Sequence, residues 1–228
     1  MQCWGNNNTC GALGNTTMTE SLVPIAIAGI AGAIAVSAGS DSTCTILGDG
    51  MVWCWGCYDL GGLRTSGLGS PSPVAVAGIG NAMAVSVGEG YGCAILGGGS
   101  VTCWGALSDL IDPGRVAGDL GPKPVAGITN AVALAAGGSH NCVVLSDGGV
   151  KCWGDNSYGR LGNGTTVDSR VPVSVAGVTS AIAVATGVSH TCAMLKGGGV
   201  RCWGDNSYGQ LGNGSRVSSP TPVDVTGF

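Results

Sequence analysis

The sequence has few charged residues and few aromatic ones. Charged side chains make up 10% of the 228 residues and aromatic side chains 5%, and the nine lysines and arginines are scattered rather than clustered. Proteins that bind a phosphate backbone or an anionic membrane usually carry a basic stripe, whereas the net charge here is −4. Nucleic acid and anionic membranes are therefore not expected as partners.

Catalytic and targeting motifs are also missing. The chain has no Gly-x-Ser-x-Gly elbow, no Walker loop, no His-Glu-x-x-His pair and no paired carboxylates. We therefore expect it not to be an enzyme and to need no cofactor. The opening residues, MQCWGNNNTC, contain no basic segment followed by an apolar one, so no signal peptide is visible.

One uncharged run, residues 21–39, approaches the length of a membrane span. Comparable runs recur at residues 73–88, 124–137 and 172–187, each with a proline, a central glycine and stretches of period two. This pattern indicates two strands joined by a turn, so we expect no membrane span. The 44 glycines also disfavour long helices.

The triplet Cys-Trp-Gly occurs five times, beginning at Cys3, Cys54, Cys103, Cys152 and Cys202, in steps of 51, 49, 49 and 50 residues. A period of this size is typical of propellers and solenoids. In the last repeat we expect strands at residues 181–187, 189–195, 200–204 and 222–225. Four short strands in one such period match a propeller blade, and blades pack together because a lone blade cannot bury both faces.

Residues 137–164 and 187–214, GGSHNCVVLSDGGVKCWGDNSYGRLGNG and GVSHTCAMLKGGGVRCWGDNSYGQLGNG, resemble the repeat of the regulator of chromosome condensation family. The resemblance covers essentially the whole chain, most strongly in its last two repeats. It implies an all-β fold, a β-propeller of four-stranded blades that in this family typically number seven. The loop within residues 106–123 and the loop after Cys54 depart from the Asn-x-x-Gly-x-Leu-Gly core.

We expect one propeller domain over residues 1–228, with four complete blades and a half blade. The expected boundaries are a half blade at 1–30 and blades at 31–78, 79–127, 128–177 and 178–228. The half blade has only its third and fourth strands, and no leftover pair at the other end completes it. The chain is then a piece of a longer propeller, which we favour, or a self-pairing oligomer, or an open array; exposed strand edges of this kind invite pairing.

Eight of the eleven cysteines form pairs spaced ten residues apart: Cys44/Cys54, Cys93/Cys103, Cys142/Cys152 and Cys192/Cys202. A three-residue hairpin loop would place each pair opposite one another, with Cα atoms about 4.5–5.5 Å apart and within disulfide reach. Disulfides are favoured over buried thiols, and zinc would need Cys-x-x-Cys clusters that are not present. Disulfides would indicate an oxidising compartment.

The other three cysteines do not follow this spacing. The partner of Cys3 would stand ten residues earlier, before the first residue, which again favours a longer propeller. Cys10 and Cys57 lie in loops and have no counterpart in the repeat.

Several residues of catalytic type recur at positions that suit structural roles. His140 and His190 are replaced by serine and tyrosine in the other repeats, which indicates hydrogen-bonded strand residues rather than metal ligands. Asp155 and Asp205 begin the two Asp-Asn-Ser-Tyr-Gly loops and are expected to cap turns. One tryptophan per repeat is expected to pack between blades, namely Trp4, Trp55, Trp104, Trp153 and Trp203.

These patterns predict a non-enzymatic scaffold, outside the cytoplasm or at the cell surface, that binds a protein partner through variable loops on one rim. The candidate contact residues in those loops are Tyr58, Asp59, Arg64, Asp109, Asp112, Arg115, Tyr158, Arg160 and Tyr208. The family resemblance implies two alternatives, a guanine-nucleotide exchange factor for a small GTPase and a secreted inhibitor of an enzyme such as a β-lactamase.

Overall fold

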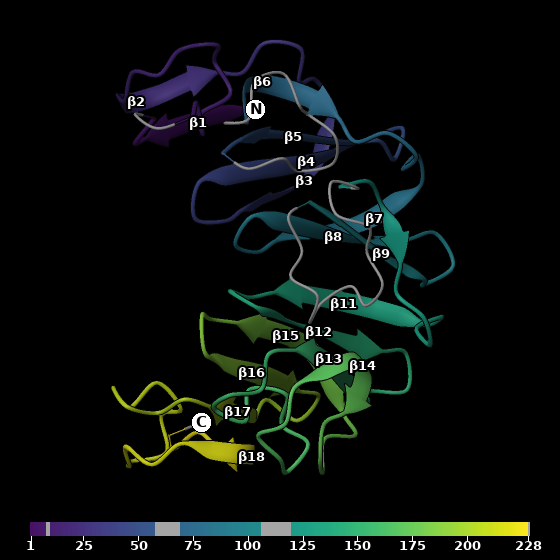
Figure 1. Ribbon diagram of the computed structural model, residues 1–228, viewed down its shortest axis with the longest axis vertical. Coiled ribbons are helices and arrows are strands. Elements are labelled where there is room, and N and C mark those ends of the chain that lie inside the picture. The colour runs from purple at the N-terminus through teal and green to yellow at the C-terminus, as the bar shows by residue number, and fades with distance from the viewer. Residues whose placement is uncertain (8–9, 58–68, 106–119, 228) are drawn as a thin grey trace. The chain divides into compact units, whose positions relative to one another are not determined.

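The structure, a computed structural model, describes residues 1–7, 10–57, 69–105 and 120–227. All regular elements in these ranges are β-strands, arranged as four four-stranded antiparallel sheets and one two-stranded sheet (Figure 1). The all-β prediction is therefore confirmed. Within the described ranges there is no helix with the length and apolar character needed to cross a membrane.

The sheets are numbered in chain order. Sheet 1 contains β1 (Gln2–Gly5) and β2 (Ser21–Ala26). Sheet 2 contains β3 (Ala33–Ala38), β4 (Ser42–Leu47), β5 (Val52–Gly56) and β6 (Ser70–Ala75). Sheet 3 contains β7 (Ala82–Val87), β8 (Tyr91–Leu96), β9 (Val101–Gly105) and β10 (Lys123–Pro124). Sheet 4 contains β11 (Ala131–Ala136), β12 (His140–Leu145), β13 (Val150–Gly154) and β14 (Ser169–Ser174). Sheet 5 contains β15 (Ala181–Thr186), β16 (His190–Leu195), β17 (Val200–Gly204) and β18 (Ser219–Asp224).

The four strands expected in the last repeat are all present; the first two differ from the expected bounds by one residue at one end, and the fourth differs more. It begins at Ser219, which pairs with Gly204, rather than at Pro222. The observed strand contains two prolines, Pro220 and Pro222. They are tolerated because β18 is the edge strand of its sheet, where an N–H on the open side is not needed for the ladder.

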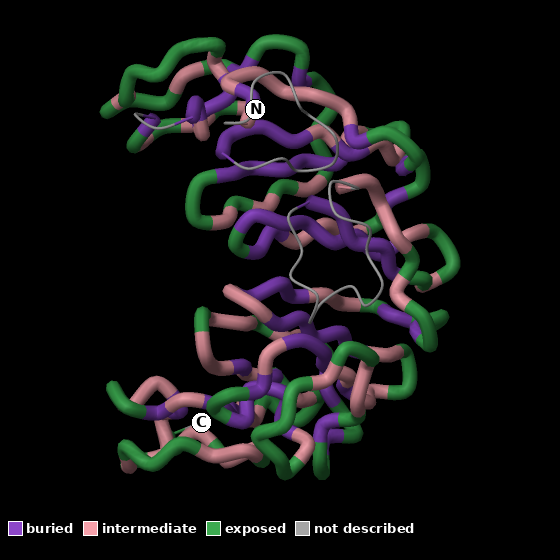
Figure 2. The backbone as a smooth tube through the Cα atoms, viewed as in Figure 1, coloured by how far each residue is buried: buried purple, intermediate pink, exposed green. Residues whose placement is uncertain are grey.

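The chain forms two compact units, one with sheets 1–3 and the other with sheets 4 and 5. In the first unit β7 lies against β3 and β4, and in the second β15 lies against β11 and β12. Small residues alternate along these strands, so neighbouring sheets approach face to face and bury an apolar layer (Figure 2). The layer between sheets 4 and 5 contains Val144, Val150, Leu161, Val178 and Trp203.

Candidate binding loops and the contacts that shape them

All four predicted cysteine pairs form disulfides across the second and third strands of their sheets. Their Cα atoms are 4.0–4.1 Å apart, and each pair is directly opposed in the strand register. The short separation is that of the closer kind of antiparallel pair, which leaves the two side chains facing each other. The hairpin turn contains no register shift between the cysteines, so the ten-residue spacing is kept.

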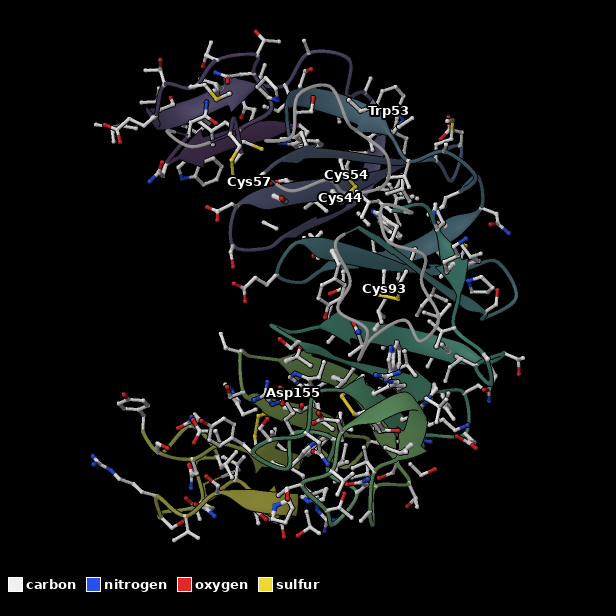
Figure 3. All side chains as sticks on the ribbon, in the orientation of Figure 1. Cys44, Trp53, Cys54, Cys57, Cys93 and Asp155 are labelled. Atoms are coloured by element: carbon white, nitrogen blue, oxygen red, sulfur yellow. A yellow bond between two sulfur atoms is a disulfide. The ribbon has the colours of Figure 1, made fainter. Side chains whose placement is uncertain are left out.

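A fifth disulfide joins Cys10 and Cys57, whose Cα atoms are 4.9 Å apart although 47 residues separate them in sequence (Cys57 is labelled in Figure 3). The sequence analysis treated both as loop residues without a counterpart and missed this bond. The two positions lie in different repeats, so the period of the hairpin cysteines could not reveal them. The bond links the loop of sheet 1 to the end of β5, whereas Cys3 is a free thiol.

Four of the five repeated tryptophans are buried, and Trp4 is exposed. Trp104 packs on sheet 2 beside Cys44 and Ile46, and Trp203 packs on sheet 4 beside Val144. Trp55 contacts Ile27 and Ile30, and its indole Nε1 donates to Ala12 O at 2.9 Å. Trp153 is fully buried.

For Trp4 the packing prediction is wrong. Its side chain is 63% exposed. The physical reason is that Trp104 and Trp203 each pack on the sheet before their own, and the described residues contain no sheet before sheet 1.

The loops that follow β13 and β17 are each held together by the hydrogen bonds of one buried asparagine. We call residues 155–168 the first loop and residues 205–218 the second loop. In the first loop Asn156 is completely buried, and its Nδ2 donates to Thr165 O and Val167 O, both at 3.0 Å. Its Oδ1 accepts from the Leu161 N–H at 2.9 Å. One asparagine thus holds both branches of the loop together.

The second loop repeats this arrangement bond for bond. Asn206 Nδ2 donates to Ser215 O and Val217 O, both at 3.1 Å, and its Oδ1 accepts from the Leu211 N–H at 2.9 Å. Asp155 and Asp205 each accept from the backbone N–H two residues later, at 2.8 and 3.1 Å, as expected of turn-capping side chains. Sequence reasoning named the Asn-x-x-Gly-x-Leu-Gly core but did not assign its asparagine a role.

The first loop also packs on sheet 5, and its glycines allow this. A Cβ on Gly162, whose φ is +66°, would stand 2.7 Å from Trp203 Nε1, and one on Gly159 would overlap Pro220. Any larger residue would push the loop off the sheet. Trp203 Nε1 then donates to Arg160 O at 2.8 Å, which fixes the loop to β17.

Arg160 was expected to contact a partner, and the structure contradicts this, because the residue is only 5% exposed. Its guanidinium lies 3.3 Å from the Asp155 carboxylate, donates to Val188 O at 3.2 Å and lies 5.4 Å from the centre of the Tyr158 ring. These groups hold the charge inside the second unit. Burial alone would raise the pKa of Asp155, but hydrogen bonds from Ser157 and the charge of Arg160 lower it overall.

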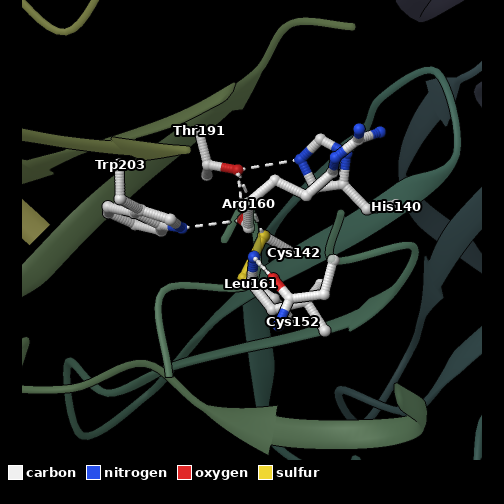
Figure 4. Close-up of a disulfide and its surroundings, with 8 residues drawn as sticks. His140, Cys142, Cys152, Arg160, Leu161, Thr191 and Trp203 are labelled. Atoms are coloured by element: carbon white, nitrogen blue, oxygen red, sulfur yellow. Dashed lines mark hydrogen bonds between the residues drawn. A yellow bond between two sulfur atoms is a disulfide. The ribbon is translucent and has the colours of Figure 1, made fainter. Parts of the chain in front are cut away.

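His140 lies beside this cluster and is fully buried (Figure 4). Its Nε2 is 2.8 Å from Thr191 Oγ1, and that hydroxyl donates its proton to Arg160 O at 3.0 Å. The imidazole Nε2 must therefore be the donor in the first bond. Burial, followed by the nearby charge of Arg160, lowers the pKa of His140 to about 3, so the ring is neutral. His190, half-buried in sheet 5, also has a lowered pKa because of burial.

The remaining contact candidates divide by exposure and by position. Tyr208 is 89% exposed and Tyr158 is 49% exposed. Tyr58, Asp59, Arg64, Asp109, Asp112 and Arg115 lie outside the described residues. Within the part of the chain that the structure describes, no three His, Cys, Asp or Glu side chains gather as a metal site.

The repeat is similar to one found in known proteins. Two sequence profiles of the regulator of chromosome condensation (RCC1) repeat match the chain, one at residues 147–194 and 197–228 and the other at residues 131–160 and 181–210. Residues 131–228 therefore carry RCC1 repeats. A search of curated proteins found no match.

Solved structures with RCC1-type folds resemble the chain. Human WBSCR16 superposes with a TM-score of 0.81 at 24% identity, over 96% of this chain and 61% of that one. Yeast RCC1 (Prp20), bound to Kap60, gives 0.76 at 19% identity, over 90% and 52%. A second Saccharomyces cerevisiae Prp20p structure, described together with binding to Gsp1p and histones, gives 0.74 at 19%, over 90% and 53%. The RCC1-type β-propeller fold is thereby shown, and the chain spans 52–61% of the length of these proteins.

Proposed function

We propose that this RCC1-repeat protein is a non-enzymatic protein-binding module of an oxidising compartment, and that it contacts its partner through the first and second loops. The observation that carries the proposal is the second loop, which combines a buried hydrogen-bonded core with an 89% exposed Tyr208. Exposed tyrosine on a preformed loop is typical of protein-recognition surfaces.

The loops are suited to binding because little order has to be gained. Asn156 and Asn206 already form hydrogen bonds with the backbone of their loops. Binding therefore costs little conformational entropy for ordering the loops, which favours higher affinity. Val167 and Val217, at matching positions, are both exposed and add apolar area to the two loops. Protein binding also agrees with the neighbours of known structure, since yeast Prp20 is described with Kap60, Gsp1p and histones.

Two further features support the remaining parts of the proposal. Five disulfides are typical of secreted or cell-surface proteins rather than of reducing compartments. The most strongly perturbed histidine, His140, is completely buried and hydrogen-bonded to Thr191, so it is a poor candidate for contact with a substrate.

The binding surface can be tested by site-specific photo-crosslinking. A photoreactive phenylalanine analogue replaces Tyr208 in one version of the chain and Leu22 in the matched control, since both residues are 89% exposed. The probe mixture is the secreted protein fraction of the source cells. We expect one defined product in stoichiometric yield from position 208 only. The same set of products from both positions would refute the loop surface.

The compartment is tested separately by the mass of the natively purified protein. Each disulfide removes two hydrogen atoms, so five bonds leave the protein lighter than the reduced chain by ten hydrogens. A fully reduced mass for freshly isolated native protein would overturn the oxidising location without affecting the loop proposal.

A further inference from the structure

The disulfide between Cys10 and Cys57 differs from the hairpin disulfides in what it joins. Each hairpin disulfide connects two adjacent strands of one sheet, whereas this bond connects two neighbouring sheets (Figure 3). Cys57 directly follows β5, and Cys10 lies in the segment before β2. We call residues 10–20 the sheet 1 loop. The bond therefore attaches the sheet 1 loop covalently to sheet 2.

The sheet 1 loop is built like the first loop, with one residue more. Asn7 Oδ1 accepts from the Leu13 N–H at 2.8 Å, just as Asn156 Oδ1 accepts from the Leu161 N–H at 2.9 Å. Leu13 is the sixth residue after its asparagine, whereas Leu161 is the fifth after its own. The additional residue falls in the stretch that contains Cys10, where the chain reaches across to the next sheet.

The two loops are attached to the following sheet by different groups. Both use a tryptophan, and in the sheet 1 loop Trp55 Nε1 donates to Ala12 O at 2.9 Å. The first loop adds the side chain of Arg160, which donates to Val188 O at 3.2 Å. Ala12 takes the place of Arg160 and has no side-chain donor. In the sheet 1 loop the disulfide therefore supplies the attachment that a guanidinium supplies in the first loop.

The sheet 1 loop also contains a strained residue. Within the part of the chain that the structure describes, Thr16 is the only residue other than glycine with a positive φ, at +69°. A β-branched residue rarely adopts this conformation. The matching residue of the first loop is Gly164, since both N–H groups donate at 2.9 Å to a proline carbonyl of the following sheet, Thr16 to Pro71 and Gly164 to Pro220. The attached loop thus holds Thr16 in an unfavourable backbone conformation.

The bond that holds this loop is also accessible to a reductant. Cys10 is 7% exposed and Cys57 is 8% exposed, whereas Cys44 and Cys54 of the neighbouring hairpin are both 0% exposed. A thiolate has to contact a sulfur atom before it can exchange with a disulfide. Of these two disulfides in the first unit, the one between the sheets is therefore the more reactive.

We propose that Cys10–Cys57 is a redox-controlled latch, opened by the dithiol of a thiol–disulfide oxidoreductase. One thiolate of the dithiol attacks a sulfur of the bond and forms a mixed disulfide, and the second thiol then displaces the protein sulfur. The two cysteines gain two electrons and two protons, and the dithiol becomes a disulfide. The sheet 1 loop then leaves sheet 2, which relieves Thr16 and uncovers Trp55, a side chain that is 1% exposed in the closed state.

The first test measures reduction of the intact, oxidised chain, with dithiothreitol as the probe. Alkylation at timed intervals and peptide mass spectrometry report each disulfide separately. Cys10–Cys57 should be reduced about tenfold faster than Cys44–Cys54, because its sulfur atoms are the more accessible. Equal rates for the two bonds would overturn the proposal. The latch residues lie in the first unit, so this failure would leave partner binding by the first and second loops unaffected.

The second test measures whether the loop is released. In the closed state the Gly14 N–H donates to Gly11 O and the Thr16 N–H to Pro71 O, both at 2.9 Å. When only Cys10–Cys57 has been reduced, protection of these two amides from hydrogen exchange should fall about 100-fold, while amides of the β4–β5 hairpin keep theirs. Unchanged protection of Gly14 and Thr16 after reduction would overturn the latch.

Two glycine substitutions in the loop give a matched pair. Thr16→Gly removes the strain, so after reduction the Gly14 amide should keep about tenfold more protection than in the native sequence. Met18→Gly is the control, because Met18 is exposed and has no positive φ to relieve. It adds flexibility alone and should not increase protection. The same gain from both substitutions, or none from Thr16→Gly, would overturn the proposal that strain at Thr16 opens the latch.

Discussion

The first and second loops are nearly the same sequence in two different surroundings. Both contain Asp-Asn-Ser-Tyr-Gly, and their asparagines form the same hydrogen bonds to within 0.1 Å, for example 3.0 Å to Thr165 O and 3.1 Å to Ser215 O. Burial nevertheless differs. Tyr158 in the packed first loop is 49% exposed, whereas Tyr208 in the second loop is 89% exposed.

This difference in burial separates the properties that depend on the local sequence from those that depend on tertiary packing. Loop shape depends on one asparagine and a few glycines within the repeat, so both copies fold alike. Ionisation and access depend on the neighbouring sheet: sheet 5 covers His140 completely, while His190, at the same position of its own repeat, is half-buried. Identical motifs can therefore differ in chemistry when only one of them is covered.

The largest expected effect of this covering is a dependence of stability on pH through His140. Its pKa is about 3 in the folded protein and 6.5 in the unfolded chain. Below pH 6.5 the unfolded chain binds a proton that the folded protein does not. The free energy of unfolding therefore decreases as the pH is lowered. The loss should reach about 3 kcal/mol at about pH 4, and is absent above the unfolded pKa.

The contribution of His140 is isolated by difference. Urea unfolding of the native protein and of His140→Gln is measured across this pH range, and the native protein should lose more stability as pH falls. Arg160, Asp155 and His190 are the charged or titratable groups near the ring, and all three remain in the variant. His190→Gln is the matched control and should retain most of the native slope, because His190 is only half-buried. Parallel slopes for native protein and His140→Gln would contradict the buried neutral histidine.

A second test exchanges the residues that distinguish the loops. Arg160→Gln gives the first loop the residue of the second, removes the contacts to Asp155 and Val188 O, and should lower the free energy of unfolding by about 2 kcal/mol. It should also raise the pKa of His140, since a nearby positive charge is lost; NMR titration of the imidazole measures this.

The reciprocal change, Gln210→Arg, is the control. Gln210 Nε2 donates to Asp205 at 2.8 Å in a loop that no following sheet of the described chain covers, so the new guanidinium stays hydrated. Stability should change by no more than about 0.5 kcal/mol. A cost at Gln210 as large as that at Arg160 would mean that the local sequence, rather than the covering sheet, determines the difference.

The sequence predicted those parts of the fold that repeat. Cysteines ten residues apart could be assigned to opposing strands because a short hairpin fixes their register, and Cys192 and Cys202 are indeed opposed. The bond between Cys10 and Cys57, the burial of Arg160 and the exposure of Trp4 were not predictable in this way. Each depends on which sheet lies beside a given copy of the repeat, and the period contains no information about that.

The smallest expected effect concerns the hairpin disulfides of sheets 4 and 5. Their reduction rates test, without any mutation, whether the following sheet shields a disulfide from solvent. Cys142–Cys152 is completely buried beneath Thr191, whereas Cys192 is partly accessible and Cys202 is 3% exposed. A phosphine must reach a sulfur atom to reduce it, so in the native protein Cys192–Cys202 should be reduced about tenfold faster. Alkylation at timed intervals, followed by peptide mass spectrometry, measures both rates at once. In concentrated urea the two should react alike, because the spacing and flanking sequence are nearly the same. Equal reduction rates for the two disulfides in the native protein would show that sheet 5 does not shield Cys142–Cys152 from the reductant. The first loop, which packs on the same sheet, would then be no better protected from solvent than the second loop.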